Sequence, residues 1–183
     1  MSPDEAADQF WTYSVTLYDR EEVRHILLTL QNRFQYNVNV VLWCCWSAAA
    51  GWALTEEEVR DITRQVDDFT TYGVERLREV RRFAASSKPG FPEASLHRLY
   101  DKLLDVELEA ERLVQYRLAA ETAALPSPAR GPAGDFKATA CRHFQSVAPS
   151  LEKPILLADD AWSGAPAALF DKLLDLVTTE TAE

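Results

Sequence analysis

An apolar run long enough to cross a membrane is missing from this sequence. The longest one, residues 38–50, is interrupted by Asn39 and Ser47. It falls well short of the roughly 20 residues that a membrane helix needs. Residues 1–5 are acidic and are not followed by an apolar stretch, so we expect no signal peptide. These absences predict a cytoplasmic protein that does not bind membranes.

Cysteine is scarce as well. The chain has three, the adjacent pair Cys44 and Cys45 and the distant Cys141. Neighbouring cysteines do not have the Cys-x-x-Cys spacing of redox or zinc sites. We therefore expect reduced thiols buried in the core, which fits a cytoplasmic protein.

Basic charge is in deficit, since 29 acidic residues face 19 basic ones and the net charge is −10. Recognition of nucleic acid depends on Lys and Arg displacing counterions, so this balance argues against nucleic acid and anionic lipid as partners. One basic cluster exists, and it is predicted to be a solvated helix face paired with neighbouring acids. It consists of Arg76, Arg78, Arg81 and Arg82.

Motifs of catalysis and cofactor binding are also missing. The sequence has no glycine-rich phosphate loop, no Gly-x-Ser-x-Gly elbow and no Cys–His dyad spacing. We therefore expect no cofactor, and the sequence favours a protein that is not an enzyme.

What the chain does have is helical periodicity, from about residue 8 to residue 122. Residues 37–50 are apolar nearly all round, so this helix must be enclosed by other helices. Asn37 is expected to cap its start, and Gly51 ends it. The fold class that follows is all-α, a helical bundle around a central apolar helix with a C-terminal helical extension.

Capping residues place two further helix starts. Asp19 with Glu22 is expected to cap the helix before the central one. Thr55 with Glu58 forms the clearest capping box, opening a long helix that runs to about residue 85.

A break at residues 86–92, rich in Ser, Pro and Gly, ends that long helix. Beyond it, apolar residues recur at spacings of three and four, which is typical of a coiled-coil seam. The short break then makes the two helices antiparallel neighbours. The seam consists of Leu96, Leu99, Leu103, Val106, Ala110 and Leu113.

Three regions follow along the chain. Residues 1–124 are expected to form the helical bundle domain, and residues 125–134 a linker of Pro, Gly and Ala. Residues 135–183 form a C-terminal extension whose amphipathic helix, residues 166–178, is expected to dock on its own bundle.

Two asparagines flank the start of the most apolar helix. Asn37 is accounted for as a cap, whereas Asn39 sits where a polar group costs free energy unless it is hydrogen-bonded. We expect a buried tie to a neighbouring helix. The alternative is that Asn39 lines a small-molecule pocket with Trp43 and Trp46.

Two glutamates occupy an unexpected place beside the apolar seam. Glu107 lies between apolar or aromatic positions one heptad away on either side, and Glu111 is one turn further along the same face. Counting back across the loop puts Glu107 near Thr71 and Glu111 near Asp67 and Asp68. Carboxylates that converge in this way repel one another unless arginines or a cation intervene.

Two interpretations of these carboxylates stay open. The first is an arginine–carboxylate network, for which Arg64 and Arg112 are the available partners. The second is a divalent metal site, with Asp67, Asp68, Glu107 and Glu111 as candidate ligands. Two further residues are candidates either to line a pocket or to be buried polar groups, namely Arg78 and Arg81.

Aromatic, Asn and Glu/Arg positions occur in an order that resembles a family of small uncharacterised proteobacterial proteins. The similarity covers residues 8–120 and leaves the tail from Leu125 unmatched. The resemblance implies a helical cytoplasmic bacterial protein and supplies no chemistry, and Tyr36 departs from the small or acidic residue expected there. The segments that carry it are Phe10-Trp11, Leu17-Tyr18, Val23 to Gln31, Asn37 to Trp46, Leu77 to Arg81, Leu99 to Leu103 and Glu107 to Arg112.

Two classes of function remain. The first, which the sequence favours, is a non-enzymatic binding or regulatory module that engages a protein partner or a second copy of itself. The second is a ligand- or metal-dependent helical enzyme that uses carboxylates between the two long antiparallel helices.

Overall fold

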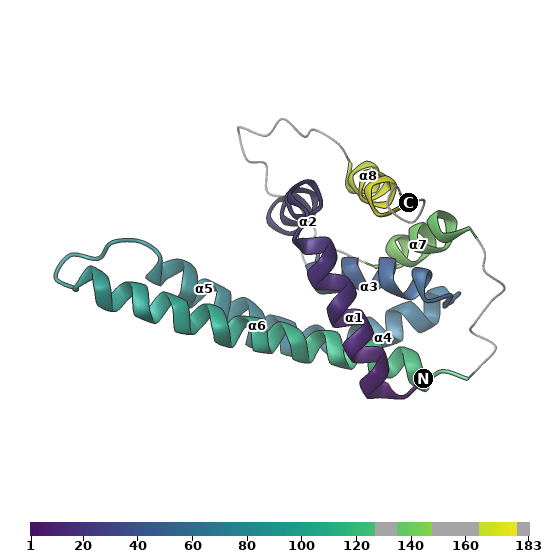
Figure 1. Cartoon of the computed structure of the whole chain (residues 1–183), viewed down its shortest axis with the longest axis horizontal. Coiled ribbons are helices and arrows are strands. Elements are labelled where there is room, and N and C mark those ends of the chain that lie inside the picture. The colour runs from purple at the N-terminus through teal and green to yellow at the C-terminus, as the bar shows by residue number, and fades with distance from the viewer. Residues whose placement is uncertain (127–134, 148–164, 179–183) are drawn as a thin grey trace.

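A computed structural model describes residues 1–126, 135–147 and 165–178. Within these residues the chain is helical, with no strand, so the predicted all-α fold is confirmed. No described helix is both long and apolar enough to span a membrane. The elements (Figure 1) are α1 (Pro3–Tyr18), α2 (Glu21–Phe34), α3 (Val38–Ala49), α4 (Glu56–Phe69), the π-helix η1 (Thr70–Val74), α5 (Glu75–Ala84), α6 (Glu93–Ala124), α7 (Phe136–Gln145) and α8 (Pro166–Thr178).

Helix α3 is the centre of the fold, as its composition predicts. Asn37 caps it by accepting a hydrogen bond from the backbone N–H of Asn39 at 3.0 Å. The chain leaves it at Gly51, whose φ of +82° is a left-handed conformation that glycine adopts without steric cost. Nearly every residue of α3 is buried, because α1, α2, α6 and α7 all pack against it.

Helices α7 and α8 contribute to the same apolar core. Phe144 of α7 stacks on Phe170 of α8 with 4.1 Å between ring centroids, and α8 also packs on α2. Arg20 donates to the carbonyl of Leu176 at 2.8 Å. The C-terminal helix therefore docks on its own chain. Residues 127–134 of the predicted linker, and residues 148–164 and 179–183 of the predicted extension, lie outside the described residues.

The long helix predicted to start at Thr55 is present, with its capping box formed by Thr55 and Glu58. It runs through η1 into α5, and the π-helical segment contains Gly73. Each π turn adds a residue to the helix and so rotates every side chain that follows it. The face that α5 presents to α6 therefore cannot be obtained by extending the periodicity of α4.

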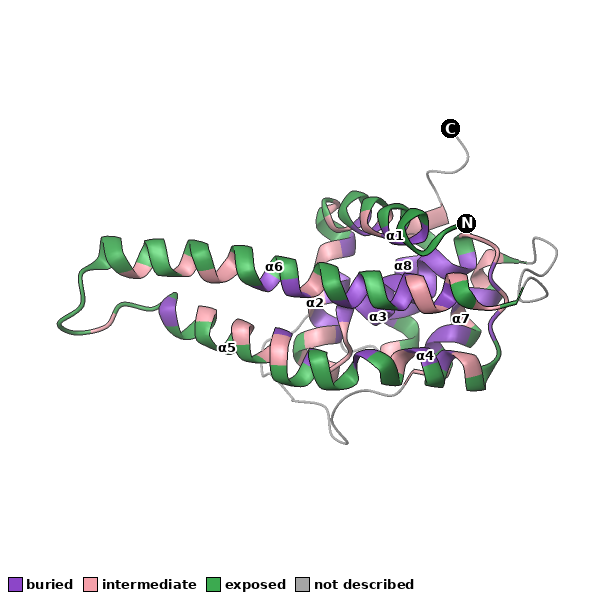
Figure 2. Cartoon of the chain, turned by 90° about the horizontal axis from the view of Figure 1, so that it is seen from below, coloured by how far each residue is buried: buried purple, intermediate pink, exposed green. Residues whose placement is uncertain are grey.

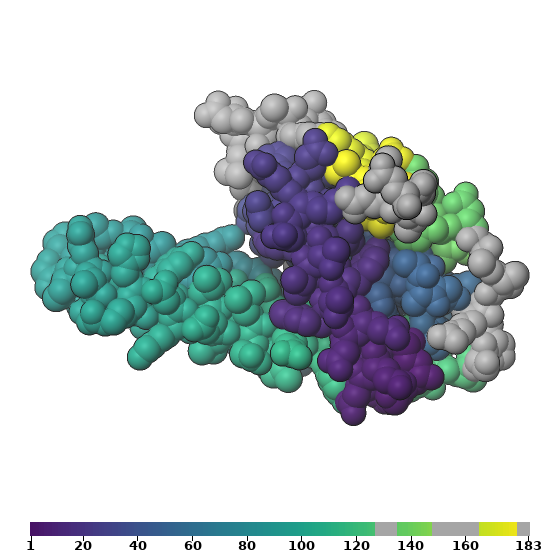
Figure 3. Space-filling view, viewed as in Figure 1, coloured from purple at the N-terminus to yellow at the C-terminus, as the bar shows by residue number. Residues whose placement is uncertain are grey.

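Helices α5 and α6 form an antiparallel arm that projects from the body, the part built by α1–α4, α7, α8 and the C-terminal half of α6 (Figures 1 and 3). Helix α6 spans 32 residues, or about 48 Å at 1.5 Å per residue. Its first turns extend beyond the end of α5, and residues 85–92 run outward beside these turns to the tip of the arm, where α6 begins (Figure 1). Ala84 and Ser87 accordingly share a surface hollow with Leu96 and Tyr100.

The predicted seam of the arm is only partly right. Leu96 and Leu103 are half-buried and Ala110 is buried, but the other three members point outward. Leu99, Val106 and Leu113 are 46%, 51% and 58% exposed, whereas Glu107 is only 4% exposed. A pair of helices can bury only one stripe of each, and α6 turns toward α5 the stripe that contains Glu107. Figure 2 shows the result, an arm that is largely exposed beside a body whose interior is buried.

The expected cap of α2 is also wrong. Arg20 occupies the N-cap position without a side-chain hydrogen bond, and Asp19 is instead the C-cap of α1. The turn between α1 and α2 is so short that Asp19 belongs to the end of the preceding helix.

Candidate functional site

A cavity of about 390 Å³ lies where the arm joins the body, in the size range of small-molecule sites. Five helices supply its walls, namely α1, α2, α3, α5 and α6. The polar and charged side chains that line it are Ser14, Tyr18, Asp19, Arg24, Gln31, Asn39, Arg78, Arg81, Arg82, Glu107, Glu111 and Gln115. The apolar ones are Trp11, Val15, Leu28, Val38, Leu42, Leu104 and Leu108.

One wall of the cavity is a network of two arginines from α5 and two glutamates from α6. Arg81 donates from Nε to Glu107 Oε2 at 2.5 Å and from an Nη atom to Oε1 at 3.2 Å. Arg78 donates to Glu107 Oε1 at 3.0 Å and to Glu111 at 2.6 Å. Arg81 also donates to the hydroxyl of Tyr100 at 3.3 Å. The two positive and two negative charges cancel.

Burial and charge act in opposite directions on these carboxyls. Burial works to raise the pKa of Glu107, but the hydrogen bond from Arg81 and the charge of Arg78 outweigh it and leave the pKa below its ordinary value. Burial raises the pKa of Glu111 despite Arg78, and the nearby charge of Glu107 adds to the effect. Glu107 is therefore the ionised centre of the network.

The predicted neighbours of these glutamates are wrong. Glu107 does not lie near Thr71, and Arg64 and Arg112 are not its partners. Arg64 pairs with Asp61 on its own helix, and Arg112 lies over the ring of Trp11 at 5.3 Å. The prediction assumes a tight turn between the two helices. Residues 85–92 instead run beside α6, so each residue of α6 lies opposite a residue of α5 that is nearer the tip of the arm than predicted.

The basic cluster on α5 is only partly the solvated face that its composition predicts. Arg76 does pair with Glu79 on its own helix, in an exposed position. Arg78 and Arg81 instead turn inward to the glutamates of α6. Arg82 donates to the side chain of Asn32 at 3.0 Å, which joins the arm to α2.

The inner end of the cavity is polar and incompletely hydrogen-bonded. Gln115 donates to Asn39 Oδ1 at 2.8 Å, so the buried tie expected for Asn39 exists, and it joins α3 to α6. The other amide atom of Gln115, Oε1, forms no hydrogen bond to any described residue, and neither does the hydroxyl of Ser14. Ser14 is 3% exposed and Gln115 4%. Both atoms are thus removed from bulk water beside an open volume.

The alternative that Asn39 lines a pocket together with Trp43 and Trp46 holds for Asn39 alone, since neither tryptophan lines this cavity. Trp43 points elsewhere in the core, donating to Thr122 at 2.9 Å, and Trp46 packs on Phe10. Asn37 donates to the hydroxyl of Thr70 at 3.1 Å and so fixes the start of α3 to η1.

The four carboxylates proposed as metal ligands are divided between two places. Glu107 and Glu111 face Arg78, which lies 11 residues beyond Asp67, or about 16 Å along a helix. Burial, followed by the charge of Asp68, raises the pKa of Asp67. Among the described residues, no group of three or more His, Cys, Asp or Glu side chains is placed to hold a metal ion.

A second feature is the apolar face of the arm, which we define as the exposed groove between η1–α5 and α6. Leu113 and Val106 lie on the α6 side, and Phe69, Tyr72 and Val80 on the other. All five side chains are more than two-fifths exposed. Arg76 and Glu109 also line the groove, one from each helix.

A buried histidine, His143, lies outside both the cavity and the apolar face of the arm. The Nε2 atom of His143 accepts from the backbone N–H of Leu54 at 3.1 Å, so the ring proton is on Nδ1 and is donated to Ser47 at 3.0 Å. Burial, and to a lesser extent the charge of Arg142, lower the pKa of His143 to about 4. This histidine is a neutral structural tie between α7 and α3.

Sequence reasoning missed Ser14, Gln115 and His143. Gln115 sits eight residues beyond Glu107, two helical turns along the same face of α6, and that spacing could have identified it. Ser14 and His143 gave no such signal, because a single small or polar residue on a helix is usually exposed.

A family described as a protein of unknown function (DUF2390) matches residues 9–118, which is 110 of the 183 residues. This match confirms the resemblance to an uncharacterised family over residues 8–120. No curated protein and no solved structure matches the chain.

Proposed function

We propose that this chain, which belongs to the DUF2390 family of proteins of unknown function, is a non-enzymatic module that pairs with a second copy of itself through the apolar face of the arm. The observation that carries the proposal is the exposed stripe of Leu99, Val106 and Leu113 on α6. These residues are seven apart, the repeat with which one helix faces another in a coiled coil. Pairing of two arms gives a four-helix bundle.

Apolar exposure on this scale favours a partner. Soluble proteins rarely leave large contiguous apolar patches open to water, and such patches usually mark interaction sites. Phe69, Tyr72 and Val80 extend the α6 stripe across the groove onto the neighbouring helix. Only η1, α5 and α6 line the groove, and no third helix from the described residues covers this face.

Charge favours a second copy over a charged partner. Residues 75–113 contain eight basic and eight acidic side chains, so the net charge of −10 lies entirely outside the arm. Two arms can therefore approach without the repulsion that separates the two bodies. Arg76 and Glu109 line opposite sides of the groove, so a two-fold axis would place each Arg76 beside the Glu109 of the other copy.

The bacterial cytoplasm is the compartment that we propose for this module. Cys44 and Cys45 support it, since both are free thiols buried in the core. The enzyme alternative has less support, because Glu107 and Glu111 are held by arginines and not aimed at an open position.

Light scattering and sedimentation equilibrium on the full chain test the pairing. We expect a species of twice the chain mass of 20.7 kDa. Val106→Glu combined with Leu113→Glu should give a folded monomer, because both side chains are already exposed. Phe91→Glu, which is equally apolar and exposed but lies outside the groove, should leave the dimer intact.

A charge swap tests the geometry. Arg76→Glu alone should weaken the dimer by placing two acids together, and adding Glu109→Arg should restore it. A wild-type chain that stays monomeric at 100 µM, or a dimer unaffected by the double glutamate variant, would overturn the proposal.

A further inference from the structure

We propose that the cavity at the base of the arm is a binding site for a small amphipathic organic anion, a molecule with a ring-sized apolar body, an uncharged hydrogen-bond donor at its inner end and a carboxylate or sulfonate at its outer end. The site is independent of the pairing of arms, since none of the residues at the apolar groove that we place at the dimer contact lines the cavity.

The inner end of the cavity is suited to a ligand that donates hydrogen bonds. Gln115 Oε1 can only accept, and its own amide nitrogen is already used on Asn39. The Ser14 hydroxyl can donate or accept, and it too has no partner among the described residues. A buried polar atom left unpaired costs free energy that a ligand hydroxyl or N–H would recover. Two buried polar atoms that lack hydrogen bonds and line the same cavity are uncommon, because most buried polar groups in proteins are hydrogen-bonded.

The middle of the cavity is apolar. Val38 and Leu42 of α3 are buried, and Leu28 and Leu104 are half-buried on two other walls. Trp11 and Tyr18 of α1 add aromatic surface. Pockets for small molecules combine such walls with a few placed polar groups. A flat ring system fits these walls better than a highly hydrated sugar or polyol.

The outer end is positive on a chain that is strongly negative. Arg78 and Arg81 are neutralised by the glutamates, but Arg24 forms no ion pair with any described residue, and Arg82 has a neutral partner, Asn32. Asp19 is the one acid that lines this end. Two guanidinium groups against one carboxylate leave a positive charge that attracts a planar anion.

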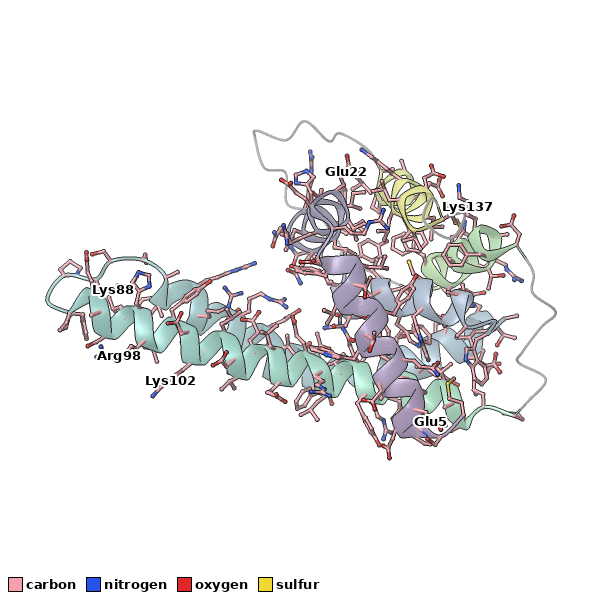
Figure 4. All side chains as sticks on the ribbon, viewed as in Figure 1. Glu5, Glu22, Lys88, Arg98, Lys102 and Lys137 are labelled. Carbon is pink, nitrogen blue, oxygen red and sulfur yellow. The ribbon has the colours of Figure 1, made fainter. Side chains whose placement is uncertain are left out.

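Other basic residues of the arm do not contribute. Figure 4 shows Lys88, Arg98 and Lys102 far out on the arm, away from its junction with the body. The positive charge at the cavity therefore belongs to the cavity and is not the edge of a broad basic surface.

A matched pair of fluorescent probes tests the proposal on the full-length protein. The anionic probe is 8-anilino-1-naphthalenesulfonate, which has an apolar ring body, an N–H donor and a sulfonate. The neutral probe is N-phenyl-1-naphthylamine, the same body without the sulfonate. We expect saturable binding of the anionic probe with one site per chain, and binding of the neutral probe weaker by about tenfold.

Two substitutions locate the probe. Ser14→Leu fills the inner end and should lower the affinity for the anionic probe at least about tenfold. Arg24→Gln should weaken the anionic probe alone and so abolish the difference between the two. Arg60→Gln, a matched loss of an exposed arginine on α4, should change neither affinity.

The outcomes separate this site from the pairing of arms. Probe binding must persist in the monomeric Val106→Glu, Leu113→Glu variant, because that variant leaves the cavity unchanged. Unchanged affinity in a folded Ser14→Leu protein would overturn the site. Arg24→Gln keeps the test decisive if Ser14→Leu does not fold. An anionic-probe affinity that Arg24→Gln does not change would overturn the anionic part, and so would equal affinities of the two probes for the wild type.

Discussion

Helix α6 runs through both regions of this molecule, and its two halves are stabilised differently. In the body, Leu118 and Val114 are buried among apolar side chains from several helices. In the arm half of α6, the residue most deeply buried is the charged Glu107, and apolar side chains such as Leu99 and Val106 are exposed. The body is held by burial of apolar surface, and the base of the arm by ion pairs.

This difference separates stability from function. The body has an enclosed apolar helix and buried polar side chains that bond to each other, such as Trp43 to Thr122 and His143 to Ser47. The arm and its junction differ, since they expose apolar surface and leave the Ser14 hydroxyl and Gln115 Oε1 without a hydrogen bond to any described residue. Regions that depart from the rules of stability are where functional surfaces are expected.

The largest predicted effect is a difference in free energy of unfolding between a substitution in the body and one in the arm. Leu118→Ala, at a position that is fully buried, should lower the free energy of unfolding by about 4 kcal/mol, because it removes packed methyl groups and leaves a cavity. Phe83→Ala removes a larger side chain from the arm but should cost at most about 1 kcal/mol, since Phe83 is 66% exposed and its ring lies beneath Lys88 as a cation–π pair. Urea unfolding followed by circular dichroism measures both, and equal losses would contradict the contrast.

The body could be predicted well from the sequence because its signals are local. The apolar run after Asn37, the stop at Gly51 and the Thr55–Glu58 capping box each depend on residues within a few positions of one another. Helix α8, predicted at residues 166–178, likewise follows from its own amphipathic spacing.

The antiparallel pair of helices and several residues of the cavity could be predicted, among them Asn39, Arg78 and Glu107. The rotation, the register and the assembly of the cavity could not, because they depend on long-range geometry. The rotation of α6 is set by Arg78 and Arg81, whose direction depends on the π turn before them. The register depends on the path of residues 85–92, which no residue pattern specifies. The sequence does place Glu107 between the two helices and offers an arginine–carboxylate network as one interpretation. It does not give the partners of Glu107, which are Arg78 and Arg81, 29 and 26 residues away.

Removal of the charge at the base of the arm should have the second largest effect. Glu107→Gln removes the negative charge that pairs with Arg78 and Arg81 and keeps one acceptor oxygen of two. It should lower the free energy of unfolding by about 3 kcal/mol, the lower end for breaking a buried pair because the arginines are partly exposed. Asp105→Asn, an exposed acid on the same helix, is the matched control and should change it by less than about 0.5 kcal/mol. A loss under 1 kcal/mol for Glu107→Gln would mean that the arm is not held by this network.

The smallest effect concerns the body alone and appears as a dependence on pH. The pKa of His143 is about 4 in the folded chain, against an ordinary value of 6.5. Between these values the unfolded chain binds a proton at His143 and the folded chain does not. The contribution of His143 to the free energy of unfolding is therefore fully present above pH 6.5 and is lost as the pH is lowered toward 4. From pH 7 to pH 5 this one group should remove about 2 kcal/mol from the free energy of unfolding.

Substitution of His143 isolates that contribution from the carboxyls of the arm. Glu111, whose folded pKa is raised, changes stability in the opposite direction, since its contribution is present at low pH and lost as the pH rises. It is the same in both proteins and cancels when wild type is compared with His143→Gln. The variant should be less stable at pH 7, because the bonds to Leu54 and Ser47 are perturbed, but its loss between pH 7 and pH 5 should be smaller by about 2 kcal/mol. If both proteins lose the same stability over that range, acid sensitivity arises at the ion pairs of the arm, and the body is not the part that responds to pH.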